Sequence, residues 1–269
     1  MPTNSTFNIL CLGDIVGHPG RAILQKKLGD IVTEFDIDFI VANIENSAAG
    51  FGFNSKLYNE FVLMNMDAFT SGNHVYSKRE VMDKFSVFDR LVRPINFPDA
   101  HPGKGLRVFE KHGKRIAVIN AIGRVFMPQL PHCPFEQMDV ALNQLEADIT
   151  ILDFHAETTS EKQALGWYLN NRVTVMFGTH THVQTSDARL LSKNTAYITD
   201  VGMCGAYDSV IGMDKDISVD KFITQLPARH QPVKQPNEYC IGALVTRVNL
   251  SNNSVSSVQS IHRVYNETD

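Results

Sequence analysis

Side chains that bind divalent metal ions recur along this sequence, and most of them follow an apolar run. Two histidines, His180 and His182, stand one residue apart behind Gly178 in the stretch FGTHTH (177–182). A His-x-His pair on its own has ordinary explanations, such as exposed polar residues or a hydrogen-bonded buried pair. A metal site needs further donors, which other parts of the sequence have to supply.

Nearly every apolar run that is typical of a strand ends in a side chain with a donor oxygen or nitrogen. In chain order these are Asp14, Glu45, Asn46, Asn73, His74, His155, His180 and His182. In open α/β sheets, ligands bind at the carboxyl ends of the strands. Singly, each residue fits a turn, a cap or a satisfied buried group. Together, two carboxylates, two amides and four histidines are hard to satisfy as unrelated buried polar groups, and they match a site for first-row divalent metals.

The number of donors indicates two metal ions rather than one. Six to eight donors are too many for a single zinc, and a carboxylate can bridge two ions. Carboxylate, amide and imidazole donors without cysteine suit iron, manganese or zinc. Two ions about 3.5–4 Å apart serve phosphate ester hydrolysis, since one acidifies a water and both neutralise phosphoryl oxygens. A histidine beside the ions, such as His74, can protonate the leaving alkoxide.

The donors depend on elements that alternate along the chain between β-prone and amphipathic patterns. We expect strands at 7–13, 38–45, 67–72, 149–157, 173–180 and 195–200, and hairpins at 106–123 and in the tail, turning at 251–253. We expect helices at 20–35, 55–66, 78–88, 134–147 and from 159 onward. This order predicts an α/β fold, βαβ-like at first and mixed later, forming a single domain over residues 1–269.

Composition narrows the classes of function. The 269 residues carry 25 Lys+Arg and 29 Asp+Glu, a net charge of −4, which gives no support to an extended nucleic-acid surface. The beginning, MPTNSTFNILCLGD, lacks a basic segment, and no apolar stretch is long enough for a bilayer. The four cysteines are widely scattered, which indicates reduced thiols. We expect a cytoplasmic protein without a membrane partner, and homo-oligomer formation stays open.

Several stretches, in family order, resemble the YmdB family of calcineurin-like metallophosphoesterases, which are bacterial cyclic nucleotide phosphodiesterases. They are GDIVGHPGR (13–21), IENSAAGFG (44–52), SGNHVY (71–76), DFHAETTSEK (153–162), GTHTHVQTSD (178–187) and TDVGMCGAYDSVIG (199–212). The resemblance implies a four-layer α/β/β/α sandwich with mixed sheets and with metals at the strand ends. It also implies iron or manganese as the metal, and hydrolysis of cyclic nucleotides, including 2′,3′-cyclic ones.

The resemblance also implies a role for each donor. Asp14, Asn46 and His182 look like ligands of one ion. Asn73, His155 and His180 look like ligands of the other. Glu45 looks like the bridging carboxylate, and His74 like the general acid. Glu157 and Asp200 are candidates to orient metal-bound histidines.

Three other functions stay open from the sequence. A phosphomonoesterase or nucleotidase would use the same metals, because the surrounding loops set selectivity. A regulatory protein would keep the metals with little turnover. An oxygenase with two histidines and one carboxylate needs only one iron and three donors, so it leaves Asn46, Asn73 and His74 unexplained. The expected substrate is a small phosphoester, and a nucleotide is expected first.

Overall fold

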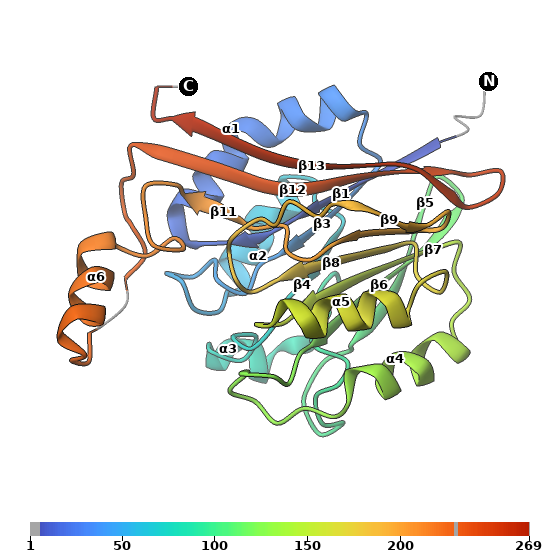
Figure 1. Ribbon diagram of the computed structural model, residues 1–269, viewed down its shortest axis with the longest axis horizontal. Coiled ribbons are helices and arrows are strands. Elements are labelled where there is room, and N and C mark those ends of the chain that lie inside the picture. Colours follow the sequence, from blue (N-terminus) through green and yellow to red (C-terminus); the bar gives the residue numbers. More distant parts are fainter. Residues whose placement is uncertain (1–5, 229–230, 269) are drawn as a thin grey trace.

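The computed structural model describes residues 6–228 and 231–268, and within them the strands form two mixed sheets (Figure 1). The first has the order β2 (Asp14–Ile15), β11 (Met203–Ala206), β12 (Glu238–Asn249), β1 (Thr6–Leu12), β3 (Phe39–Asn43) and β4 (Ala68–Thr70), and β13 (Ser254–Asn266) also pairs with β12. The second has the order β5 (Leu106–Lys111), β6 (Lys114–Ile122), β7 (Ile149–His155), β8 (Val175–Thr179), β10 (Thr195–Ile198) and β9 (Arg189–Ser192).

Helices flank the two sheets, and all but the last helix of the chain pack against a sheet face (Figure 1). They are α1 (Gly17–Phe35), α2 (Ser55–Leu63), α3 (Arg79–Asp83), α4 (Pro134–Asn143), α5 (Thr159–Tyr168) and α6 (Lys215–Thr224), with a short 3-10 helix, η1 (Phe85–Val87). In Figure 1, α1 lies on one side of the stacked sheets and α4 and α5 lie on the other. None of the helices within residues 6–228 and 231–268 combines the length and the apolar character needed to cross a membrane.

Three apolar clusters fill the spaces between the layers. Leu10 on β1 packs in the cluster that includes Leu24 of α1, whereas its neighbour Ile9 packs in the cluster that includes Val118 of β6. Successive residues of a strand point to opposite faces, so β1 contributes to both cores. A third cluster joins the second sheet to α4 and α5. The predicted four-layer α/β/β/α sandwich with mixed sheets is confirmed.

Parallel strands carry the predicted donors to one edge of each sheet. β1, β3 and β4 run parallel, as do β6, β7, β8 and β10. Hydrogen bonds join the two edges: Asn43 Nδ2 donates to Asp153 Oδ2 at 3.0 Å, and the amide of His180 donates to Asp14 Oδ2 at 3.0 Å. Donors far apart in the sequence therefore meet at one place.

The structure differs from the predicted elements mainly in short or glycine-containing segments. The sequence patterns do not predict β2, β9, β11 and α6. Most of the other elements end, in the structure, one to four residues before the predicted end. β11 reads MCGA, whose small residues give no strand pattern, and it is held between β2 and β12 instead. α6 is weakly amphipathic, and its start is defined by the Asp214 side chain, which accepts from the amides of Asp216 and Ile217.

Candidate metal centre

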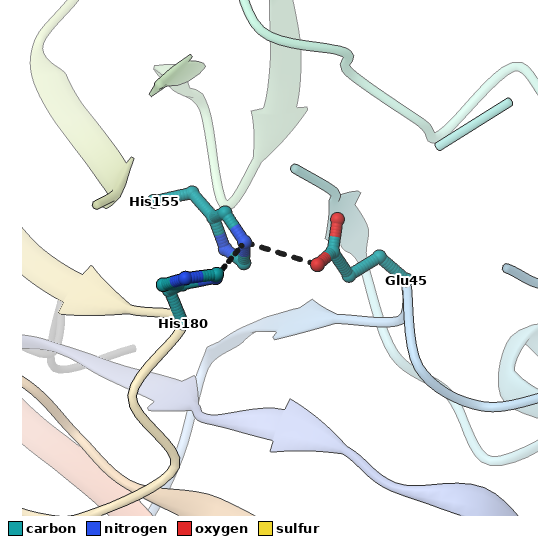
Figure 2. Close-up of side chains that lie close together, drawn as sticks. All are labelled: Glu45, His155 and His180. Atoms are coloured by element: carbon teal, nitrogen blue, oxygen red, sulfur yellow. Dashed lines mark hydrogen bonds and ion pairs between the residues drawn. The ribbon is translucent and has the colours of Figure 1, made fainter. Parts of the chain in front are cut away.

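His155 is the centre of the site. It is fully buried at the end of β7. Its Nε2 lies 3.0 Å from Glu45 Oε1, 2.8 Å from Asn73 Oδ1 and 3.0 Å from His180 Nδ1. Figure 2 shows the side chains of Glu45 and His180 converging on this nitrogen from different segments. One potential ligand atom from each of Glu45, His155 and His180 lies within 4.8 Å of the other two, so these residues form a group able to hold a metal ion.

A chain of hydrogen bonds fixes the tautomer of His155. Thr179 Oγ1 donates its proton to Asp153 Oδ1 at 2.6 Å, so this hydroxyl oxygen must accept from His155 Nδ1, 2.9 Å away. The Nε2 atom then carries a lone pair. Burial lowers the pKa of His155 to about 3, which keeps the ring neutral. A lone pair that faces two oxygens and a second imidazole nitrogen is the arrangement that a bound cation satisfies, so these residues fit a metal.

Glu45 lies in the turn after β3 and is buried. Its Oε2 accepts from the backbone amide of His74 at 3.0 Å, and its Oε1 faces His155. Burial raises the pKa of Glu45 to about 7, although the nearby His74 opposes the rise. A metal ion would offset the cost of burying this charge and would displace the proton.

Asp14 and His182 form a second pair of donors. Asp14 is fully buried, and burial raises its pKa. Its Oδ2 accepts from the amide of His180, and its Oδ1 lies 3.8 Å from His182 Nε2. His182 Nδ1 lies 2.8 Å from the carbonyl oxygen of Ile211 and must donate to it, because a carbonyl only accepts. The His182 Nε2 lone pair is therefore turned toward Asp14.

Two buried oxygens of this group have no hydrogen-bond partner among the residues that the structure describes. One is Asp14 Oδ1 and the other is Asn46 Oδ1. The Asn46 side chain donates from Nδ2 to the carbonyl of Gly50 at 2.9 Å, which commits the nitrogen and leaves the oxygen free. Unpartnered buried oxygens are rare because they are costly. Both belong to the set predicted for the same ion, and both have the chemistry of metal ligands.

The loop between the two histidines is strained and firmly anchored. His180 has φ 97° and His182 has φ 64°, conformations that cost on the order of 1–3 kcal/mol for residues other than glycine. Thr181 between them donates from its hydroxyl and its amide to Asp200 Oδ2, at 2.8 and 3.3 Å. Asp200 is itself buried and paired with Lys162 Nζ at 2.7 Å. The buried ion pair thus holds the residue that separates the two imidazoles.

The two candidate orienting carboxylates have different partners. Glu157 Oε2 lies 3.1 Å from His180 Nε2, which leaves His180 Nδ1 to face His155. Asp200 contacts Thr181 rather than a histidine, so its effect on the imidazoles is indirect. Sequence reasoning gave no role to Lys162, Thr179 or Asp153. A lysine on the inward face of α5, where an apolar residue would be expected, is the one signal that could have been noticed.

His74 lies at the rim of the centre, half-buried. Its amide donates to Glu45, and its Nδ1 lies 3.3 Å from Ser77 Oγ. The ring of Phe51 meets the imidazole edge-on, with 4.9 Å between centroids. These contacts hold an imidazole beside the donor group without burying it, which suits a group that transfers protons to a substrate.

Two glycines make the centre possible for steric reasons. A Cβ atom on Gly72 would lie 2.3 Å from Cδ2 of the His155 ring. A Cβ atom on Gly178 would lie 1.8 Å from the carbonyl oxygen of Thr199. These glycines therefore permit close packing of the protein against itself.

Known proteins share both this sequence and this fold. A 2′,3′-cyclic-nucleotide 2′-phosphodiesterase of Bacillus subtilis is 45% identical over 225 residues, which cover 83% of this chain and 85% of that protein. A crystal structure described as a novel phosphatase from Mycoplasma pneumoniae matches with a TM-score of 0.91 and 31% identity, covering 97% of this chain and 94% of that one.

A hypothetical protein from Thermus thermophilus matches with a TM-score of 0.89 and 32% identity, covering 96% of this chain and 99% of that one. The sequence pattern of the family described as YmdB-like protein matches residues 10–261, a range that includes every donor of the centre. On this sequence match, and with the shared fold, the chain belongs to the YmdB-like family.

Proposed function

We propose that this protein is a di-metal phosphodiesterase that hydrolyses small nucleotides, most of all cyclic nucleotides, including 2′,3′-cyclic ones. The observation that carries the proposal is the Nε2 lone pair of His155, which faces Glu45, Asn73 and His180 inside the protein. The substrate class is supported by the name of the Bacillus subtilis relative, a 2′,3′-cyclic-nucleotide 2′-phosphodiesterase.

In this proposal the donors divide between two ions. Asp14, Asn46 and His182 would hold one ion. Asn73, His155 and His180 would hold the other, and Glu45 would be the carboxylate shared between them. The pairing of His180 with His155 and of His182 with Asp14 supports this division. In this proposal the ions are iron, and manganese or zinc would accept the same donors. When bound, they supply an activated water and neutralise the phosphoryl oxygens.

The protein's own contribution to the reaction is proton transfer and positioning. His74 donates a proton to the departing alkoxide. With Nδ1 directed at Ser77, the opposite nitrogen, Nε2, is the one available to the leaving oxygen. The backbone contact between His74 and Glu45 ties the acid to the bridging carboxylate, so the acid keeps its place relative to the reacting phosphorus.

The test is the substitution His74→Ala, compared on two substrates. A general acid contributes roughly 10²–10⁴-fold, and it matters most when the leaving group is a poor one. We expect His74→Ala to keep its metal content, to lose about that factor on a 2′,3′-cyclic nucleotide, and to lose far less on a p-nitrophenyl diester. His112→Ala, a change of an exposed histidine in the β5–β6 turn, is the matched control. Full activity of His74→Ala on the cyclic nucleotide would reject the role.

A phosphomonoesterase is the second candidate, because the Mycoplasma pneumoniae structure is described as a phosphatase. Turnover of a 2′,3′-cyclic nucleotide and of the corresponding nucleoside monophosphate by the same metal-loaded preparation separates the two. Preference for the monophosphate would favour the phosphatase. Turnover of neither by a fully loaded protein would favour a regulatory role.

A further inference from the structure

We propose that a cavity beside His74, with walls formed by Phe51, Pro232 and Val233, holds the nucleobase of the substrate. This inference rests on the proposed function, because it names the part of the nucleotide that this cavity takes. The cavity has a volume of about 690 Å³, and its walls are mainly apolar. That volume is within the range of sites that enclose small organic ligands.

Phe51 links the cavity to the metal centre. The loop between β3 and α2 carries both Phe51 and Asn46, whose Oδ1 is one of the unpartnered oxygens. The Phe51 ring contacts the His74 ring. Phe51 is 37% exposed, whereas Phe53, two residues later, is fully buried and packs on Phe88. Of these two phenylalanines, Phe51 is the one with ring surface left for a ligand.

The chemistry of the leaving group selects this cavity. In an in-line displacement the nucleophile and the leaving oxygen lie on opposite sides of phosphorus. His74 protonates the leaving oxygen, so the leaving group lies on the His74 side. In a 2′,3′-cyclic nucleotide the leaving oxygen belongs to the ribose, and the base is bonded to C1′, the neighbour of C2′. The base must therefore lie beyond His74, where Phe51 is.

A second cavity near the centre fits this requirement less well. It has a volume of about 650 Å³ and is lined by His182, with Tyr207 and His262 farther along its wall. His182 is a proposed metal ligand on the Asp14 side of the site. The proposed proton donor, His74, does not line this second cavity. The ribose that carries the leaving oxygen, and the base attached to it, would reach this cavity only by crossing the metal centre.

Charges at the rim suit a nucleobase. Lys78, Lys234 and His18 all line the cavity, although the chain as a whole has a net charge of −4. Ammonium and imidazole groups can donate to the ring nitrogens and carbonyl oxygens of a base. Stacking of a base on an aromatic side chain is sequence-tolerant, since every base has a π-face. The cavity should therefore accept several bases, with Phe51 as the main contact.

The test compares a 2′,3′-cyclic nucleotide with a diester that lacks only the base, the 2,3-cyclic phosphate of methyl riboside. Removing one stacked aromatic side chain weakens base binding by about 10- to 100-fold. For Phe51→Ala we expect the preference for the nucleotide, as a ratio of kcat/KM values, to fall by about that factor, mainly through KM. Phe51→Trp should retain the preference. Trp167→Ala, an exposed aromatic at the end of α5, is the matched control and should behave as wild type.

Each other outcome has a defined meaning. An unchanged preference in Phe51→Ala would overturn the inference. Equal losses on both substrates would also overturn it, because Phe51 would then act only by positioning His74. If wild type turns over neither diester, the proposed function fails, and calorimetry decides the inference alone. In that case adenosine 3′-monophosphate should bind more tightly than ribose 3-phosphate to wild type, and Phe51→Ala should abolish the difference.

Discussion

Replacing Lys162 with methionine should destabilise the protein strongly, although this residue is not a metal ligand. Lys162 and Asp200 are both fully buried, and Lys162 Nζ lies 2.7 Å from Asp200 Oδ2. The carboxylate also accepts from the hydroxyl and amide of Thr181 and, at 2.8 Å, from the amide of Gly202. Lys162→Met keeps the volume roughly constant and leaves this carboxylate buried without its counter-charge.

Removing one partner of a buried ion pair costs about 3–5 kcal/mol. For a chain of this size, each kcal/mol shifts Tm by about 2–4 °C, so we expect a fall of about 6–20 °C. Asp200→Asn should cost a similar amount, and it should also weaken metal binding, because an amide holds Thr181 less firmly than a carboxylate does. The double variant should be less destabilised than the sum of the two, since neither charge is then left alone.

The assay is thermal unfolding of metal-free protein, with metal content measured on parallel samples. Arg79→Ala breaks the exposed ion pair between Arg79 and Asp83 and is the matched control, because exposed pairs contribute little. A Tm for Lys162→Met within about 2 °C of wild type would refute the reasoning, because the expected loss is several times larger. Strict additivity in the double variant would refute it as well.

Two further predictions concern the metal centre itself. Gly72→Ala should lose bound metal, because the new Cβ would lie 2.3 Å from the His155 ring. The control, Gly29→Ala, has open space around its new Cβ and should keep the metal. Equal metal content in the two variants would contradict this prediction. Because burial raises the pKa of Glu45 from 4.5 to about 7, the folded metal-free protein binds this proton more tightly than the unfolded chain does. Wild type should therefore lose stability relative to Glu45→Gln as pH rises from 4.5 through 7, by about 3 kcal/mol. Urea unfolding of both proteins at pH 5 and pH 8 measures this, and a stability difference that does not change with pH would count against it.

Local patterns predicted an α/β fold and the position of the donors, whereas the four-layer sandwich was implied by the resemblance to the family. Apolar runs mark buried strands, and in parallel strands the polar residue that follows each run must reach the same edge. His155 and His180 could be grouped on that ground, because they follow neighbouring strands of one sheet, whereas Asp14 follows a strand of the other sheet. The turn of the closing hairpin, between β12 and β13, was also predicted, since polar residues interrupt a long β-prone stretch there.

Other features depend on contacts that no local pattern records. The insertion of β12 between β1 and β11 is a long-range pairing, which leaves no trace in the sequence of either partner. The same holds for the Thr179–Asp153 contact that sets the tautomer of His155 and for the positive φ angles of His180 and His182. The structure also separates the buried Phe53 from the partly exposed Phe51, a difference that two phenylalanines in one glycine-rich loop do not reveal in the sequence.

The central claim, that His180 and His182 serve different metal ions, is tested most directly by a crystal structure of protein purified without added metal. Anomalous scattering at the absorption edges of iron, manganese and zinc would locate and identify the ions. We expect two ions bridged by Glu45, with His180 on the ion that contacts His155 and His182 on the ion that contacts Asp14. Both histidines on one ion, or neither on any ion, would contradict the account.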